Sequence, residues 1–194
     1  MIALDNTEPA KFDKGHYRSL SSDMSRAGTG RVLAALDGSP ALDIFKARRI
    51  TKITLARMMQ EGINGFYEPL TGVVHVGTAR RAESYGRPFE PGTSWSVSSA
   101  GSDKFDAMGR TLIHESGHHL QAIGGSDVSK IAATAFRNSY ARPITQYGKR
   151  SASEYVAETW AAYHAEMDKL RSFDPVGVKM MGDIVQKLRE MLKI

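Results

Sequence analysis

The stretch that decides the fold is residues 103–125, DKFDAMGRTLIHESGHHLQAIGG, which holds three of the six histidines of the chain. Apolar residues recur along it at helical spacing and two glycines close it, so the pattern predicts one amphipathic helix that ends near Gly124. His114 and His118 are four residues apart, so both imidazoles project from the same face of this helix. Glu115 follows the first histidine directly. The predicted helix therefore presents two imidazoles and a carboxylate together.

The pattern H-E-x-x-H has a specific chemical meaning. Two neutral imidazole nitrogens one helical turn apart can bind one Zn²⁺ at about 2.0–2.1 Å each. The glutamate beside the first histidine is placed to accept a proton from a water molecule on the metal. We therefore expect His114 and His118 to bind one Zn²⁺ per chain, and Glu115 to be the general base.

A third protein ligand is needed, because catalytic zinc usually takes three and keeps its fourth position for water. The metzincin pattern requires a glycine three residues after His118 and a histidine three residues beyond it. The chain has Gln121 and Gly124 at these positions, which rejects that class. Asp127 is an aspartate near enough in sequence to be considered, but it is the weaker candidate.

A glutamate on a later helix is the better candidate for the third ligand. Glu154 and Glu158 are four residues apart, on one face of a helix that Ser151 is predicted to cap. Taken alone, the first fits a capping-box acid and the second a solvated helix face. Beside H-E-x-x-H, we expect one of them to bind the metal and the other to orient a ligating imidazole.

Residues 147–158, YGKRSASEYVAE, resemble the catalytic segment of the anthrax lethal factor-like metallopeptidases, a family that includes the Pro-Pro endopeptidases. That family pairs H-E-x-x-H with a tyrosine seven residues before a glutamate ligand, which is followed by two apolar residues, an alanine and a second glutamate. The resemblance implies that Glu154 is the third ligand, Tyr147 the donor to the developing oxyanion, and Glu158 the acid behind a ligand. It covers about residues 62–168.

The remaining pattern predicts an α+β fold. A β-branched segment at 50–55 and a hairpin at 66–76 indicate strands, and helices are expected over 31–49, 126–138, 151–169 and 175–194. The resemblance makes this fold zincin-like, with a small twisted sheet and its edge strand, an active-site helix, and a mostly helical C-terminal half. We expect a single domain over 31–194, preceded by a loosely ordered arm, residues 1–30.

Substrate contacts are predicted for the second strand of the hairpin. Val74, His75 and Val76 are expected to form the edge strand, along which an extended peptide binds by β-augmentation. The long segment 77–101 has little apolar periodicity, and we expect it to form a loop at the rim of the cleft.

Composition narrows the possible partners of the 194-residue chain. It has no cysteine, which excludes disulfides, thiolate zinc sites and cysteine nucleophiles, and it has no apolar run long enough for a membrane span. The net charge is +5, but the basic residues are spread along the chain, so we expect no nucleic-acid partner. A protein or peptide substrate is the expected partner.

The sequence fits two locations of the protein. No signal peptide pattern is seen. A peptidase delivered as a secreted toxin or effector fits the resemblance, with the arm 1–30 contacting delivery machinery; a cytoplasmic location is the other expectation.

Two functions therefore compete. The first is a zinc-dependent endopeptidase of the gluzincin type. The alternative is a non-catalytic binding or structural module that contains zinc. Glu115 and Tyr147 separate them, because a purely structural zinc site needs neither a base nor an oxyanion donor.

Overall fold

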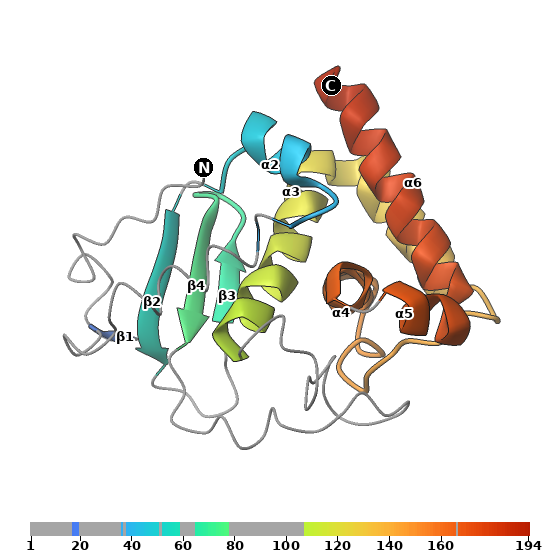
Figure 1. The fold of residues 1–194 in the computed structure, drawn as a ribbon, viewed down its shortest axis with the longest axis horizontal. Helices are drawn as coiled ribbons and strands as arrows, with labels where there is room; N and C mark the ends of the chain where they lie inside the picture. The colour runs from blue at the N-terminus through green and yellow to red at the C-terminus, as the bar shows by residue number, and fades with distance from the viewer. Residues whose placement is uncertain are drawn as a thin grey trace.

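The protein has a mixed α+β structure that is mostly helical. A computed structural model describes residues 17–19, 36, 38–50, 52–58, 65–77, 107–165 and 167–194. A small sheet lies on one side of the long helix α3, and the helices α4, α5 and α6 lie on its other side (Figure 1). This arrangement places α3 in the middle of the molecule, in contact with both parts.

In the part of the chain that the structure describes, the sheet has four strands in the order β1-β2-β4-β3. Strand β1 (Tyr17–Ser19) pairs antiparallel with β2 (Lys52–Met58), which runs parallel to β4 (Val73–Gly77). Strand β3 (Gly65–Glu68) forms an antiparallel hairpin with β4, in the register Gly65–Val76 to Glu68–Val73. The strand at 50–55 and the hairpin at 66–76 are thus confirmed, with small shifts of their ends.

Helix α3 (Ala107–Phe136) carries the H-E-x-x-H motif and contacts β3 and β4. Its apolar residues Leu112, Ile113 and Leu120 are buried in the main core. Gly125 has a φ of +52°, a conformation that suits glycine, and it kinks the helix between two segments. The glycine pair therefore interrupts the helix near the predicted stop, and the helix expected over 126–138 follows it to Phe136.

The C-terminal half consists of α4 (Ala152–Ala165), α5 (Met167–Phe173) and α6 (Pro175–Leu192). The helix expected over 151–169 is confirmed in the described residues, which form α4 and the start of α5, and α5 extends to Phe173. Trp160 on α4 is fully buried, and its Nε1 atom donates a hydrogen bond of 2.9 Å to Ser116 Oγ on α3. This bond joins α4 to the motif helix next to the histidines.

The start of α6 is tied to α4 and to the segment before it. Asp174 is fully buried, and its carboxylate accepts a hydrogen bond of 2.5 Å from the Tyr155 hydroxyl and one of 3.2 Å from the backbone N–H of Arg142. The connector that follows Arg142 leads to Tyr147, so these bonds help to fix the segment that enters the site.

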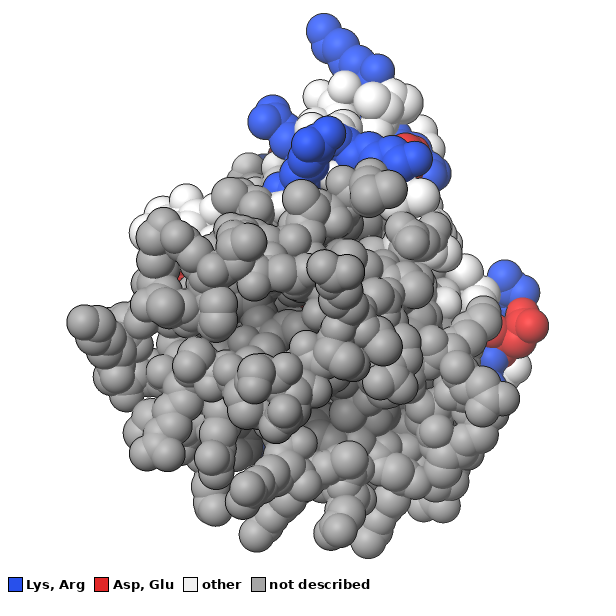
Figure 2. Space-filling view, turned by 60° about the vertical axis from the view of Figure 1, so that its left-hand side comes forward, with Lys and Arg blue, Asp and Glu red and all other residues white. Residues whose placement is uncertain are grey.

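Helix α2 (Leu42–Ala47) is held against α6. The Arg189 guanidinium on α6 binds the Asp43 carboxylate, with 2.7 Å between Nε and Oδ2. Figure 2 shows lysine and arginine side chains at the end of the molecule where α2 and the C-terminus of α6 lie, and Lys46, Arg48 and Lys193 are exposed there. None of the described helices combines the length and the apolar character that a membrane crossing requires.

Two sequence expectations fall mostly outside the described residues. In the arm 1–30, the described residues Tyr17–Ser19 form strand β1, an element that the sequence pattern did not predict. The loop expected at 77–101 lies outside the described residues apart from Gly77, the last residue of β4.

Candidate metal centre

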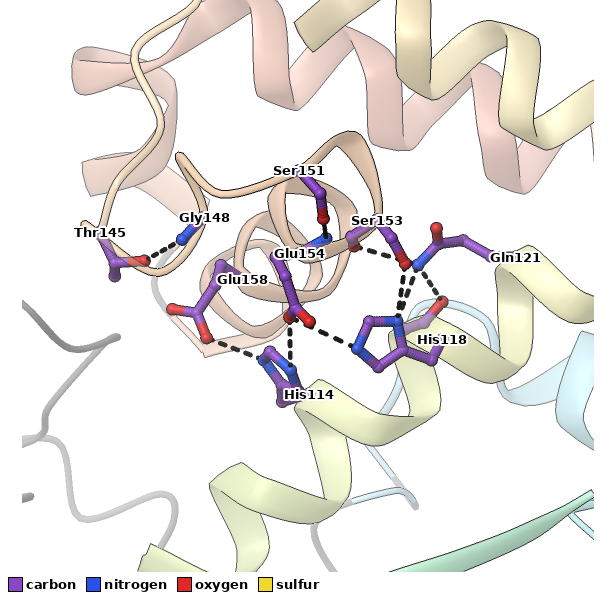
Figure 3. Close-up of polar contacts among 10 residues, drawn as sticks. His114, His118, Gln121, Thr145, Gly148, Ser151, Ser153, Glu154 and Glu158 are labelled. Atoms are coloured by element: carbon purple, nitrogen blue, oxygen red, sulfur yellow. Dashed lines mark hydrogen bonds and ion pairs between the residues drawn. The ribbon is translucent and has the colours of Figure 1, made fainter. Parts of the chain in front are cut away.

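The two histidines of the motif lie one turn apart on α3, as their spacing predicts. The centroids of the His114 and His118 rings are 5.1 Å apart, and both side chains point towards α4 (Figure 3). The opposite face of this part of α3 is buried in the core through Ile113 and Leu120. Burial of that face fixes the rotation of the helix, and therefore the direction in which the imidazoles project.

Glu154 reaches the two histidines from the first turn of α4. Its backbone N–H donates a hydrogen bond of 3.1 Å to Ser151 Oγ, so Ser151 caps the helix as predicted. The Glu154 carboxylate does not complete a capping box. It turns to the imidazoles instead, with its Oε2 atom 3.3 Å from His114 Nε2 and 3.5 Å from His118 Nε2 (Figure 3).

The spacing of these three atoms fits a tetrahedral metal ion. Their ligand atoms all lie within 4.8 Å of one another. Two zinc bonds of about 2.0–2.1 Å at a tetrahedral angle separate the ligand atoms by about 3.3–3.4 Å. The two distances from Glu154 Oε2 are close to this value. Within the described residues, this buried oxygen accepts no hydrogen bond, which leaves it dependent on a cation. His114, His118 and Glu154 can therefore hold a metal ion together.

The Nδ1 atom of each imidazole, on the side of the ring away from Glu154, also has a polar neighbour. His114 Nδ1 lies 2.8 Å from Glu158 Oε1, and Glu158 is almost completely buried. His118 Nδ1 lies 3.2 Å from Ser153 Oγ and 3.1 Å from Gln121 Nε2. Both Nε2 atoms are thereby left to face Glu154. Glu158 thus has the place predicted for an acid behind a ligand.

The charges at this centre favour a cation. Burial lowers the pKa of His114, but the carboxylates of Glu154 and Glu158 outweigh it and raise that pKa well above the ordinary value. Burial also acts on Glu154, raising its pKa, yet contacts with the two imidazoles bring it well below the usual range. The ionised carboxylate therefore matches either a protonated imidazole or a bound metal ion.

Glu115 lies at the same cavity as the histidines. The side chain is only 5% exposed, and burial raises its pKa, an effect that the neighbouring histidines oppose. Strand β3 passes close to it, because a Cβ atom at Gly65 would lie 3.2 Å from Glu115 Oε1 and would overlap Thr111. A glycine at this position lets the strand approach the carboxylate.

Tyr147 enters the site from the connector before α4. Its ring centroid lies 5.9 Å from that of His114, and the Arg150 guanidinium lies 4.7 Å from the ring on one face. A turn holds this position, with the Arg150 N–H bonded to the Tyr147 carbonyl at 3.0 Å. Burial, with help from Glu154, raises the pKa of Tyr147 to about 12, so the phenol keeps its proton at neutral pH.

One cavity of about 440 Å³ connects these groups. Strand β3 and its turn line one part of it, α3 another, and the Tyr147 connector with the start of α4 a third. The sequence-predicted residues His114, Glu115, His118, Tyr147 and Glu154 all line it. The others that line it are Gly65, Phe66, Tyr67, Pro69, Gln121, Ala122 and Ser153.

The prediction that Val74, His75 and Val76 form the edge strand is wrong. Val74, His75 and Val76 belong to β4, which lies between β2 and β3, so both of its edges are hydrogen-bonded within the sheet. Val74 and Val76 are buried in the core, and His75 stacks on Phe66 at 4.1 Å between ring centroids. Among the described strands, the edge strand beside the cavity is β3, because it pairs with β4 alone.

Asp127 is not part of the centre. It lies on α3 beyond the kink, where its Oδ2 atom contacts Lys187 Nζ at 3.1 Å. The alternative third ligand is therefore not supported by the geometry.

Two pairs of residues at the site were not predicted from the sequence. Gln121 and Ser153 contact His118, but their types and spacing carry no signal of their own. His119, which received no role, is buried and holds Tyr67 in the cavity wall, with 2.9 Å between Nδ1 and the Tyr67 hydroxyl oxygen. Its Nε2 atom lies 3.0 Å from the Arg48 carbonyl. His119 is therefore a structural residue rather than a metal ligand.

Comparisons with known proteins do not assign the chain to a family. No model of a known family matches the sequence, and no curated protein is significantly similar to it.

Proposed function

We propose that the protein is a zinc-dependent endopeptidase of the gluzincin type, with a zincin-like fold related to that of the lethal factor-like metallopeptidases. The observation that carries this proposal is the meeting of His114, His118 and Glu154 in a cavity that also contains Glu115 and Tyr147. A structural metal site would need neither Glu115 nor Tyr147.

The donor set suits zinc. Two imidazole nitrogens and one carboxylate oxygen form a three-residue set typical of catalytic zinc, with one position left for water or substrate. When bound there, zinc supplies Lewis acidity, which lowers the pKa of a water molecule towards about 7 and polarises the scissile carbonyl.

The protein residues have distinct parts in the proposed reaction. The Glu115 carboxylate accepts the proton of the attacking water and delivers it to the leaving amine nitrogen. Tyr147 donates its phenolic hydrogen to the substrate carbonyl oxygen as negative charge develops on it. The raised pKa of Tyr147 supports this role, because a phenolate has no proton to donate.

The edge strand supports a peptide as the substrate. Within the described part of the sheet, β3 pairs on one side only, with β4. Gly65, Phe66 and Tyr67 on this strand line the cavity. An extended peptide can add to β3 through main-chain hydrogen bonds, which would lay its backbone across the metal centre. Delivery of the protein as a toxin or effector stays a prediction.

Two linked measurements test the proposal. Elemental analysis after dialysis is expected to give about one zinc per chain for the wild type and for Glu115→Gln, and little for Glu154→Ala. Glu190→Ala, a change of an exposed glutamate on α6, is the matched control and should keep its zinc. A peptide mixture from a digested proteome, analysed by mass spectrometry, should be cleaved by the wild type and not by Glu115→Gln.

The outcomes separate the two candidate functions. Zinc that depends on Glu154, together with cleavage that depends on Glu115, supports the endopeptidase. Zinc without cleavage in the wild type would favour the non-catalytic module. Absence of zinc from the wild type, even after zinc is added back, would refute both.

A further inference from the structure

We infer that Ser153 is a positioning residue for the metal centre, because its hydroxyl is the group that accepts the Nδ1 proton of His118 when Nε2 of that ring binds a metal. This inference rests on the metal site of the proposed function. It concerns a residue that neither the motif nor the resemblance assigns.

The Nδ1 atom of His118 has two polar neighbours, and only one of them can accept its proton. Metal binding through Nε2 requires the proton of the neutral ring to be on Nδ1. The Gln121 Nε2 atom, at 3.1 Å, is an amide nitrogen that donates hydrogen bonds and accepts none. The Ser153 oxygen, at 3.2 Å, both donates and accepts.

The orientation of the Gln121 amide is fixed by backbone carbonyls. Its Nε2 atom lies 3.2 Å from the Ser153 carbonyl oxygen and 3.4 Å from the Gly117 carbonyl oxygen. Carbonyl oxygens only accept, so the amide nitrogen belongs on this side. A flipped amide would place its own oxygen against both. Gln121 therefore cannot provide the acceptor, which leaves this role to Ser153.

Gln121 has a different part in the same arrangement. Its bond to the Ser153 carbonyl connects α3 with the first turn of α4 (Figure 3). This connection holds the Ser153 hydroxyl beside the imidazole, one residue before Glu154. The capping hydroxyl of Ser151 is a separate group, so a change at Ser153 leaves the cap of α4 intact.

The two metal-binding imidazoles thus have unlike partners. A buried carboxylate, Glu158, holds His114, whereas a neutral hydroxyl holds His118. With Glu115 and Glu154, the cavity already has two other carboxylates close to the metal position. A neutral partner at His118 orients the ring without adding a further negative charge.

The test is the zinc affinity of Ser153 variants, measured by competition with a chromophoric chelator. Ser153→Ala is expected to bind zinc about tenfold more weakly than the wild type, at the lower end of the 10–100-fold loss typical of such partners. Ser153→Thr keeps the hydroxyl and should restore most of the affinity. Ser129→Ala is the matched control, because Ser129 is an exposed serine on α3 that bonds the Gly125 carbonyl.

Two further measurements exclude a merely structural role. The melting temperature of the metal-free protein should be the same in Ser153→Ala and Ser129→Ala. The visible spectrum of the cobalt-substituted protein, which reports ligand geometry, should change in Ser153→Ala and return in Ser153→Thr.

Each outcome decides between the possibilities. Wild-type zinc affinity and an unchanged cobalt spectrum in Ser153→Ala would overturn the inference while Glu154→Ala still established the metal site. A loss of affinity that is matched by a lower melting temperature of the metal-free protein would also overturn it. Failure of Glu154→Ala to lose zinc would instead count against the proposed function.

Discussion

Helices α3 and α4 approach each other closely at Gly117, between the two histidines of the motif. A Cβ atom at this position would lie 2.9 Å from the Ala157 Cα atom, and 3.2 and 3.3 Å from two carbon atoms of Trp160. Carbon atoms prefer separations of about 3.5–4.0 Å. Because Ala157 Cα is backbone, it cannot rotate away. In Gly117→Ala, α4 must therefore shift locally by about 0.6 Å or more.

The expected cost to stability combines two opposing effects. Overpacking of this kind typically destabilises by about 1–3 kcal/mol. Alanine in place of glycine inside a helix stabilises by about 0.8–1 kcal/mol. We therefore expect the metal-free Gly117→Ala protein to be destabilised by about 0–2 kcal/mol, so that it remains folded.

The effect on metal binding should be larger, because a zinc site tolerates ligand displacements of only about 0.2 Å. A shift of α4 moves Glu154 relative to the imidazoles on α3. We expect zinc affinity to fall by at least about 10–100-fold, the range seen when ligand orientation is disturbed.

The assay pairs urea unfolding of the metal-free protein with a zinc competition titration. Gly182→Ala on α6 is the matched control, since a Cβ there meets nothing within 4 Å. This control should gain up to about 1 kcal/mol and bind zinc as the wild type does. If Gly117→Ala behaved like Gly182→Ala in both measurements, the close approach of the helices would not set the geometry of the site.

Three further predictions concern other groups. Tyr147→Phe should lower turnover by about 10²–10³-fold, through loss of an oxyanion donor, with zinc content by elemental analysis unchanged; normal turnover would remove Tyr147 from the mechanism. Glu158→Gln should weaken zinc binding about tenfold in a competition titration, because His114 keeps an acceptor but loses a charged one; wild-type affinity would show that the charge is unimportant. Burial lowers the pKa of His75 below its ordinary 6.5, although Glu68 nearby opposes this shift. The contribution of the neutral His75 ring to stability is therefore present above pH 6.5, and it is lost as the pH falls through the pKa of the folded state. The difference in unfolding free energy between wild type and His75→Gln should accordingly shrink from pH 7 to pH 5, and a constant difference would contradict this.

The sequence predicts local geometry where a few neighbouring residues determine it. The period of a helix brings His114 and His118 to one face, and the hydroxyl of Ser151 caps the helix that presents Glu154. Pro175 marked the start of α6 correctly. In each case the signal lies within about one helical turn.

Long-range pairing was not readable in this way. The pattern of the hairpin is the same whether β3 or β4 is the edge strand, and the parallel pairing of β2 with β4 decides it. The contact of Ser153 with His118 spans 35 residues and depends on how α4 crosses α3. Such contacts follow from packing, and the types of the two residues do not predict them.

The ion pair between Asp43 and Arg189 joins positions 146 residues apart. Because closing so long a loop costs conformational entropy before any contact forms, α2 should reach its final place late in folding. The carbonyl at the end of α2, on Arg48, holds His119, which in turn holds Tyr67 in the cavity wall. A chain whose last helix has not yet docked would therefore have an incomplete wall beside His114, His118 and Glu154. The cavity at this cluster is then a late product of folding, formed only once both ends of this loop have met.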